Sequence, residues 1–395
     1  MAKKILVIDD SALMRRVISD IINESNEYEV AAIAKDGLEG LDMIVSNPYE
    51  YSAVILDINM PKLNGLELLQ RLQKDHIEQT VIVVSTVARE GAKETIQALE
   101  YGAFDFVTKP ENYLETKSVE FKNRIFEMLN VATNSKASIR RTSMSKTIAP
   151  VKKDLKSGRT LTSVTARTER TRSTGITPAP VRTVVHTPAK KVDGSMFTSV
   201  KTGKKIVALA CSTGGPKSLQ QVIPMLPAKL DAGVVLVQHM PAGFTASLAA
   251  RLNEMSDINV KEAADGDVIK KGWVYIAPGG KHIRIEKKGT DSVIKLSTEP
   301  PIEGLRPCAN VMYESLTSSN YDEITCVVLT GMGADGTNGI KALNKNHKNI
   351  YVIAQDEETS VVYGMPKAIA GTGLVNEVVP LNRVAEAITK NVGVS

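Results

Sequence analysis

Short apolar runs followed at once by polar clusters recur along this chain, and this pattern restricts it to an open α/β sheet. The clearest cases in the C-terminal half are Lys205–Cys211 before Ser212, Gly233–Gln238 before His239, and Ile324–Thr330 before the glycine-rich segment that holds Asp335. Ligands of an open parallel sheet bind outside the carboxyl ends of its strands. The pattern therefore predicts that Ser212, His239 and Asp335 meet at one sheet edge, as the nucleophile, base and orienting carboxylate of an acyl-transfer site.

The first 134 residues show the same alternation on a smaller scale. The apolar runs that predict strands are Lys4–Ile8, Glu29–Ala34, Ala53–Leu56, Val81–Val84 and Asp105–Val107. The amphipathic stretches that predict helices are Met14–Ile22, Leu38–Ile44, Leu66–Leu72 and Lys93–Leu99, with a last helix from about Glu115. This order predicts a doubly wound, flavodoxin-like (βα)5 domain, followed later in the chain by a second α/β domain with a mainly parallel sheet.

A basic segment rich in Ser and Thr separates the two regions. Residues 136–201 hold 15 Lys and Arg against three acids, a charge of +12 in a chain whose total is +5. Such a composition cannot bury enough apolar surface to offset its ordering entropy, which predicts a disordered linker. A nucleic-acid-binding tail is the alternative, but aromatic or Gly-Arg interleaving is missing, and we expect no nucleic-acid partner. The predicted domains are residues 1–134 and 204–395, joined by a linker over 135–203.

Composition excludes several protein classes. No apolar run approaches the roughly 18 residues of a membrane span, and the chain starts with Met-Ala-Lys-Lys and runs directly into a predicted strand. The three cysteines form no C-x-x-C pair, which argues against a disulfide framework and against a zinc site. We therefore expect a soluble cytoplasmic protein.

Acidic residues collect at the carboxyl ends of the N-terminal strands. Asp9, Asp10 and Asp57 would repel one another at one edge unless a cation neutralised them, and hard oxygen ligands favour Mg²⁺. Lys109 at the same edge is suited to a phosphoryl oxygen, and Ser85 adds a hydroxyl. The set predicts a Mg²⁺-dependent site of phosphoryl transfer.

These residues resemble the signature of two-component receiver domains. The matching segments are Ile8-Asp9-Asp10-Ser11, Leu56-Asp57-Ile58-Asn59-Met60-Pro61, Asn64-Gly65, Val84-Ser85 and Lys109-Pro110. The resemblance implies that Asp57 accepts a phosphoryl group. It implies metal ligation by Asp10, Asp57 and the backbone carbonyl of Asn59, with Asp9 acting through bound water. The implied switch residues are Ser85, Phe106 and Lys109, of which Lys109 contacts the phosphoryl oxygens.

The Ser212 cluster by itself has two interpretations. A strand, the pair Gly214 and Gly215, and Pro216 at a helix start are consistent with a phosphate cradle, although neither G-x-G-x-x-G nor a Walker lysine is present. The alternative is a strand-to-helix turn that carries a serine nucleophile. The joint occurrence of Ser212, His239 and Asp335 at three strand ends favours the nucleophile, and backbone amides near Asp335 are suited to an oxyanion hole.

The second region is similar to the catalytic domain of the bacterial chemotaxis protein-glutamate methylesterases, the CheB family. The segments that carry this similarity are Ala210-Cys-Ser-Thr-Gly-Gly215, Val237-Gln-His-Met-Pro241, Gly243-Phe244-Thr245, Tyr275-Ile-Ala-Pro-Gly279, Lys281-His282, Leu329-Thr-Gly-Met-Gly333, Asp335-Gly336, Ile353-Ala-Gln355 and Val362-Tyr-Gly-Met-Pro366. A receiver followed by this domain is the architecture of the family.

That similarity implies a serine esterase that releases methanol from glutamate γ-methyl esters on chemotaxis receptors and deamidates receptor glutamines. It places the Met332 N–H in the oxyanion hole and Thr213 at the substrate. It implies a chemotaxis histidine kinase as phosphodonor, a monomer without a cofactor for ester hydrolysis, and association with membrane receptor arrays. It also implies that the unphosphorylated receiver docks over the triad and that phosphorylation of Asp57 loosens this block.

Two departures from the family pattern stand out. Arg306-Pro307 continues as Cys308-Ala309-Asn310, where the family usually has Ser-Val-Asp, and Ala210 replaces a glycine. If the family's Asp helps shape the substrate cleft, Asn310 removes a charge there. We expect neither departure to touch the triad.

Two alternatives from other classes remain at this point. A receiver-linked transcription factor would require a helix-turn-helix effector, whereas the second region alternates strands with helices. A nucleotide-binding module would use the glycine-rich turns, and nucleotide affinity compared with hydrolysis of an activated ester discriminates it from an esterase.

Overall fold

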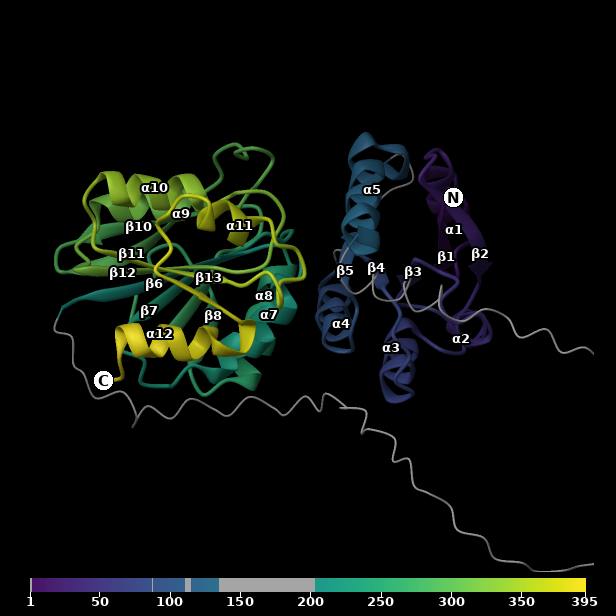
Figure 1. Cartoon of the computed structure of the whole chain (residues 1–395), viewed down its shortest axis with the longest axis horizontal. Helices are drawn as coiled ribbons and strands as arrows, with labels where there is room; N and C mark the ends of the chain where they lie inside the picture. The colour runs from purple at the N-terminus through teal and green to yellow at the C-terminus, as the bar shows by residue number, and fades with distance from the viewer. Residues whose placement is uncertain (1, 87, 111–114, 135–202) are drawn as a thin grey trace, which may run out of the picture.

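Two α/β domains lie side by side in the computed structural model (Figure 1). The structure describes residues 2–86, 88–110, 115–134 and 203–395. The predicted linker, apart from Gly203, lies outside these residues. No helix in the described ranges combines the length and the apolar character needed to cross a bilayer.

The described N-terminal residues form a parallel sheet with the strand order β2-β1-β3-β4-β5. Its elements are β1 (Lys3–Ile8), α1 (Ala12–Asn23), β2 (Tyr28–Ala34), α2 (Gly37–Ser46), β3 (Ala53–Asp57), α3 (Gly65–Lys74), β4 (Val81–Ser85), α4 (Arg89–Glu100), β5 (Asp105–Thr108) and α5 (Val119–Asn134). This order confirms the predicted flavodoxin-like domain. The last helix begins later than predicted, at Val119, because the Ser118 hydroxyl accepts the Phe121 N–H and so caps the helix start.

Successive side chains of β1 point to opposite faces of the sheet, which explains why this domain has one apolar layer on each face. Leu6 and Ile8 face a core shared with α2, α3 and α4, whereas Ile5 and Val7 face a second core against α1 and α5. All four side chains are fully buried, as expected for a parallel strand covered on both faces.

The C-terminal domain is built on a larger parallel sheet with the order β14-β13-β12-β6-β7-β9-β8. Its strands are β6 (Lys205–Cys211), β7 (Gly233–Gln238), β8 (Asn259–Glu262), β9 (Trp273–Ile276), β12 (Glu323–Val328), β13 (Ile350–Gln355) and β14 (Glu377–Val379), with an antiparallel hairpin of β10 (His282–Lys288) and β11 (Asp291–Ser297). Its α-helices are α7 (Gly215–Val222), α8 (Phe244–Met255), α9 (Ala309–Ser315), α10 (Thr337–Lys345), α11 (Met365–Ala370) and α12 (Val384–Val392). The predicted doubly wound, mainly parallel fold is confirmed, and the described residues contain no helix-turn-helix effector in its place.

Helices cover both faces of this sheet (Figure 1). Every second side chain of β6, such as Val207 and Leu209, points to one face and packs with α7, α8 and α12. The intervening side chains, such as Ala208 and Ala210, pack with α9, α10 and α11. The chain runs from β6 to β7 on one side and returns to β12 on the other, so the sheet has a topological switch point at β6, where ligands bind in open α/β folds.

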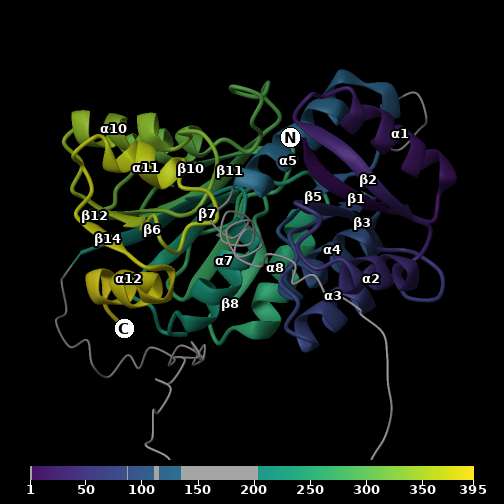
Figure 2. The ribbon, with the colours of Figure 1, turned by 45° about the vertical axis from the view of Figure 1, so that its right-hand side comes forward.

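The receiver-like domain presents α4, β5 and α5 toward the C-terminal domain, where α4 packs against α7 and α8 (Figure 2). Phe106 of β5 stacks on Phe244, the first residue of α8, with ring centroids 4.7 Å apart. Both aromatic rings are buried and belong to one apolar cluster that contains residues of both domains.

Candidate active site

The three residues predicted to form a triad follow neighbouring strands at the switch point. Ser212 comes directly after β6, His239 directly after β7, and Asp335 lies in the turn between β12 and α10. The Ser212 N–H donates to the Thr330 carbonyl at 3.0 Å, and the His239 N–H donates to the Cys211 carbonyl at 3.2 Å. Strand pairing therefore continues into the polar turns and sets their spacing.

His239 and Asp335 are in direct contact, with Nε2 2.8 Å from Oδ2. Burial opposes ionisation of Asp335, but the hydrogen bond and charge of His239 and the N–H groups of Ala309 and Asn310 outweigh it and hold the pKa at about 2. The carboxylate is therefore charged at neutral pH and fixes the ring, which leaves Nδ1 as the nitrogen free to accept a proton. Among the described residues, no hydrogen bond yet joins the Ser212 hydroxyl to this ring.

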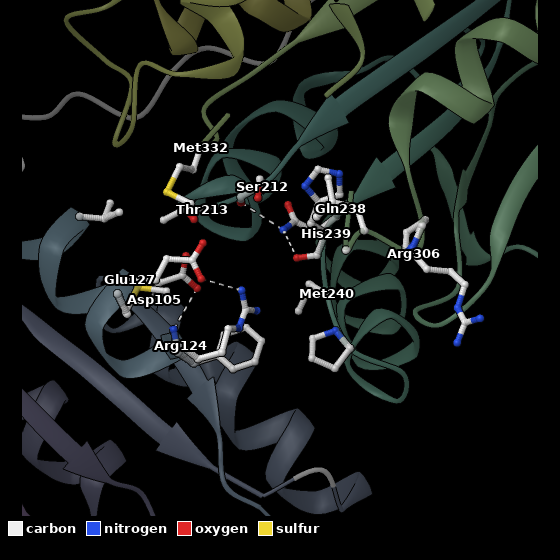
Figure 3. Close-up of a pocket in the computed structure, with 17 residues that line it drawn as sticks. Asp105, Arg124, Glu127, Ser212, Thr213, Gln238, His239, Met240, Arg306 and Met332 are labelled. Atoms are coloured by element: carbon white, nitrogen blue, oxygen red, sulfur yellow. Dashed lines mark hydrogen bonds and ion pairs between the residues drawn. The ribbon is translucent and has the colours of Figure 1, made fainter. Parts of the chain in front are cut away.

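Gln238 holds the serine and histidine turns together, a role that the sequence analysis did not assign. Its side-chain amide donates to the carbonyls of Ser212 and His239, both at 3.1 Å (Figure 3). A side chain at position 215 would collide with the side-chain amide oxygen of Gln238, so Gly215 is required for this close approach. The sequence did contain a signal for this role, because Gln238 is the polar residue that ends the otherwise apolar run of β7.

Met332 and Thr213 border the same space as Ser212. In the described parts of the chain, no hydrogen bond uses the backbone N–H of either residue. Met332 is also 42% exposed, although it follows a buried strand. Both residues therefore remain candidates for the oxyanion hole that the resemblance implies.

A cavity of about 380 Å³ lies between the two domains. One wall carries Ser212, Thr213, Gln238, His239, Arg306 and Met332, and the opposite wall carries Asp105, Phe106, Arg124, Glu127 and Met128 of the receiver-like domain (Figure 3). The candidate nucleophile and base therefore face the N-terminal domain across a small space.

Two polar contacts tie the domains together around this cavity. Asp105 Oδ2 accepts the N–H of Gly214, two residues after the candidate nucleophile, at 3.1 Å. Glu100 at the end of α4 accepts from Arg251 of α8 at 2.6 Å from Nε and 3.2 Å from Nη2. With the Phe106–Phe244 stack, these contacts hold β5 and α4 over the candidate site.

Asp105 is strongly affected by its burial in this interface. Burial raises its pKa to about 6, while the N–H groups of Phe106 and Gly214 and the charge of Arg124 act in the opposite direction. A carboxyl group that has lost its water favours the protonated form. The contact between Asp105 and Gly214 is therefore sensitive to pH below neutrality.

The predicted phosphorylation site lies at the carboxyl edge of the receiver-like sheet, whereas Asp105 begins β5 at the amino end of the strands. Lys109 Nζ is 2.7 Å from Asp57 Oδ2 and 2.9 Å from Asp9 Oδ2. Burial raises the pKa of Asp57. The positive charge of Lys109 acts in the opposite direction but does not outweigh the burial. Oxygen atoms of Asp9, Asp10 and Asp57 lie within 4.8 Å of one another, a hard-oxygen donor set that fits Mg²⁺.

Of the remaining predicted receiver residues, Ser85 ends β4 and Asn59 follows β3 at this edge, whereas Phe106 lies within β5. The Ser85 hydroxyl donates to the Gly91 carbonyl at 3.2 Å, and Phe106 points into the domain interface. The exposed Asn59 donates its side-chain amide to Glu94 at 3.0 Å, and ligation of a metal by its backbone carbonyl stays a prediction.

Comparison with known proteins identifies the family. The CheB methylesterase family model matches residues 207–388, and the response regulator receiver domain model matches residues 5–118. A protein-glutamate methylesterase/protein-glutamine glutaminase of Pyrococcus horikoshii is 39% identical over 389 residues, which cover 98% of this chain and 93% of the relative. This chain belongs to the family of protein-glutamate methylesterases/protein-glutamine glutaminases.

Two further proteins are similar to this chain. A protein-glutamate methylesterase/protein-glutamine glutaminase of Syntrophomonas wolfei is 36% identical over 390 residues, 98% of either chain. The crystal structure of the Thermotoga maritima CheB methylesterase catalytic domain is 40% identical, covers 48% of this chain and 100% of that chain, and gives a TM-score of 0.46.

One expectation about the family departures is wrong. Cys308 and Asn310 were expected not to touch the triad, yet the Cys308 thiol lies 3.2 Å from Asp335 Oδ1 and the Asn310 N–H donates to the same oxygen at 2.9 Å. Asn310 does not line the cavity either, because its side chain faces the start of α10. The segment reaches the triad because α9 packs directly on α10, which the local sequence does not reveal.

Proposed function

We propose that the chain is a phosphorylation-activated serine esterase that hydrolyses glutamate γ-methyl esters on chemotaxis receptors and deamidates specific receptor glutamines, for sensory adaptation. The observation that carries this proposal is the His239–Asp335 pair beside Ser212 in a cavity that the receiver domain covers. The relatives' names supply the substrate class, and the geometry supplies the catalytic groups.

In the first half-reaction, Ser212 Oγ attacks the ester carbonyl while His239 Nδ1 takes the hydroxyl proton. The oxyanion accepts hydrogen bonds from the backbone N–H groups of Met332 and Thr213. Collapse of the tetrahedral intermediate breaks the ester C–O bond, and His239 gives its proton to the departing methanol.

In the second half-reaction, a water molecule attacks the acyl-enzyme and His239 acts again as the base. Asp335 keeps the imidazole tautomer and stabilises the imidazolium in both steps, without taking the proton itself. A glutamine side-chain amide presents the same carbonyl, with ammonia as the leaving group, so the same residues serve deamidation.

Control follows from the position of the receiver. Residues of β5 and α5 line the cavity together with Ser212, so we expect the docked receiver to keep a receptor helix away from Ser212. A phosphoryl group on Asp57 would attract Lys109 and the Ser85 hydroxyl, and Phe106 would then leave its contact with Phe244 as part of the same rearrangement. Mg²⁺ held by Asp10, Asp57 and the Asn59 carbonyl would offset the charge of the phosphoryl oxygens.

The partners follow from the same proposal. The substrates are methyl-accepting chemotaxis receptors, and the phosphodonor is a chemotaxis histidine kinase. The enzyme acts in the cytoplasm at membrane receptor arrays, as a monomer, and its esterase step uses only its own side chains.

The test is methanol release from methylated receptor membranes, with and without a small phosphodonor such as acetyl phosphate. We expect release by the full-length protein and stimulation by the phosphodonor in the presence of Mg²⁺. Release that is absent under both conditions, from a folded protein, would contradict the proposal.

We expect autoinhibition to be stronger at pH 5 than at pH 7. The pKa of Asp105 in the docked state, about 6, lies above the ordinary value of 3.8, so docking takes up a proton between these values and weakens as pH rises through this window. Asp105→Asn keeps an acceptor for Gly214 without the charge. It should tighten docking at pH 7 by roughly tenfold or more, since each pKa unit is worth a factor of ten.

The measurement is the ratio of unphosphorylated to phosphorylated activity of the full-length protein at each pH, which cancels the titration of the catalytic groups. For Asp105→Asn, the ratio of unphosphorylated to phosphorylated activity should be low, which means strong autoinhibition, and should not change with pH. A wild-type ratio that does not change between pH 5 and pH 7 would refute this role of Asp105.

We expect the Glu100–Arg251 pair to contribute modestly to docking. Arg251→Ala should raise basal activity about threefold to tenfold, because a partly exposed but bidentate ion pair is worth about 1 kcal/mol. Adding Glu100→Ala should raise it little further, since both changes break the same contact. Arg383→Ala, which breaks the exposed pair with Glu386 away from the interface, is the matched control and should leave basal activity unchanged.

A further inference from the structure

The catalytic carboxylate is held by the first residues of α9. Asp335 Oδ2 accepts the Ala309 N–H at 2.6 Å, and Oδ1 accepts the Asn310 N–H at 2.9 Å. Burial and the charge of Asp335 raise the pKa of Cys308 to about 12, so its sulfur keeps the proton and donates to Oδ1 at 3.2 Å. The direction of Asp335 therefore depends on how α9 sits against the turn that precedes α10.

The side chain of Asn310 connects these two elements. Its Oδ1 accepts the N–H groups of Gly336 at 3.0 Å and Gly339 at 2.8 Å. Both donors belong to the start of α10, where helical N–H groups have no intrahelical partner, and Gly336 at the cap position has no side chain to satisfy them. Asn310 supplies the missing cap from the neighbouring helix.

Close packing makes this contact possible. A Cβ at position 339 would lie 2.7 Å from the Asn310 carbonyl oxygen and 2.7 Å from Cβ of Tyr313. Because Gly339 has no side chain, α9 approaches α10 closely enough for the short Asn310 side chain to reach the backbone. The contact therefore fixes the turn that carries Asp335.

The amide of Asn310 is also adjacent to the catalytic charge. The Gly336 N–H that donates to Asn310 also donates to Asp335 Oδ1 at 2.9 Å. Two oxygen atoms that share one donor lie next to each other. An aspartate at position 310 would place a second negative charge beside Asp335, whereas asparagine gives the same acceptor without charge.

We propose that Asn310 is a positioning residue for the reaction: it anchors the Asp335 turn to α9 and keeps Asp335 the one carboxylate that acts on His239 from this wall. The inference rests on the proposed function, because it assigns Asn310 a role in tuning the base of that mechanism.

The other ionisable groups around the pair come from several elements. Cys308 precedes α9 and Tyr313 lies within it, and both remain protonated because burial raises the pKa of each. On the cavity side, Arg306 lines the same wall as His239, and the docked receiver adds Asp105, Arg124 and Glu127. Phosphorylation removes the receiver groups, so the phosphorylated protein is the form in which the effect of position 310 is isolated.

The effect of a carboxylate at position 310 has a definite sign. A second negative charge favours the imidazolium form of His239, whereas the reaction needs the neutral ring as base. Because the introduced carboxylate would accept the same two N–H groups, its ionised form is favoured and the turn is preserved. The acid limb of the pH–rate profile should therefore move to higher pH by about one unit, with a plateau close to that of the wild type.

The experiment compares three variants as full-length, phosphorylated proteins, using hydrolysis of an activated ester between pH 5 and pH 9. Asn310→Asp should shift the acid limb as stated. Asn310→Ala should lower kcat about tenfold or more, because the Asp335 turn loses its anchor, with KM and the acid limb unchanged. Asn346→Asp adds the same charge at the exposed far end of α10 and should leave the profile unchanged.

An independent readout is the titration of the His239 ring by NMR, assigned through its loss in His239→Gln. The Asn310→Asp protein should show a higher titration midpoint than the wild type, whether or not Ser212 is the nucleophile. A wild-type midpoint and acid limb in Asn310→Asp would overturn the inference, even if Asn310→Ala fails to fold. Activity that persists in Ser212→Ala would instead overturn the proposed function and leave the NMR result to decide on Asn310.

Discussion

Replacing Ser212 by alanine should lower methanol release from methylated receptors by at least about 10⁴-fold, because nucleophile and base act as a unit and neither is effective alone. His239→Ala should lower the rate of methanol release by a comparable factor. Asp335→Asn should cost less than either, since the carboxylate orients the ring and does not take the proton. The measurement is single-turnover methanol release from labelled receptor membranes.

The control for this prediction is Ser318→Ala, which removes an exposed hydroxyl from the same domain and should keep the wild-type rate. Circular dichroism and the melting temperature of Ser212→Ala should match the wild type, because the Ser212 side chain makes no hydrogen bond within the described residues. Near wild-type turnover by a folded Ser212→Ala protein would rule out the serine mechanism.

Replacing Asp57 by alanine should abolish stimulation by a phosphodonor and retain the low basal activity. The acceptor oxygen is lost, Lys109 keeps Asp9 as its partner, and the docked interface is not touched. The ratio of activities with and without acetyl phosphate should therefore fall to about one. Removal of Mg²⁺ by a chelator should have the same effect on the wild-type protein.

Asp42→Ala, which removes an exposed acid from α2 of the same domain, serves as the comparison and should be stimulated like the wild type. Persistent stimulation of Asp57→Ala would show that the phosphoryl group is accepted elsewhere. If Asp57→Ala and Asp42→Ala lost stimulation to the same extent, the cause would be a general defect of the receiver and not the loss of the phosphoryl acceptor.

The elements of both domains follow closely from local sequence. The strands expected at Lys205–Cys211 and Gly233–Gln238 have those bounds in the structure. Apolar runs, turn residues and helical periodicity are properties of neighbours in the chain, so a short window contains the information. Because parallel strands end at one edge, the same pattern was sufficient to bring His239 and Asp335 together.

What surrounds those residues was decided only by the tertiary structure. Gln238 bridges two turns, Asp105 reaches Gly214 from the other domain, and Asn310 holds the turn of Asp335. Each contact joins segments that are separate in the chain, and it depends on strand order, on helix packing and on the docking of two domains. Local patterns in the chain are sufficient to predict the strands, the helices and the chemical groups at the sheet edges. The tertiary structure decided which backbone groups orient them and which surface covers them, because those contacts arise from packing over distances that no local pattern encodes.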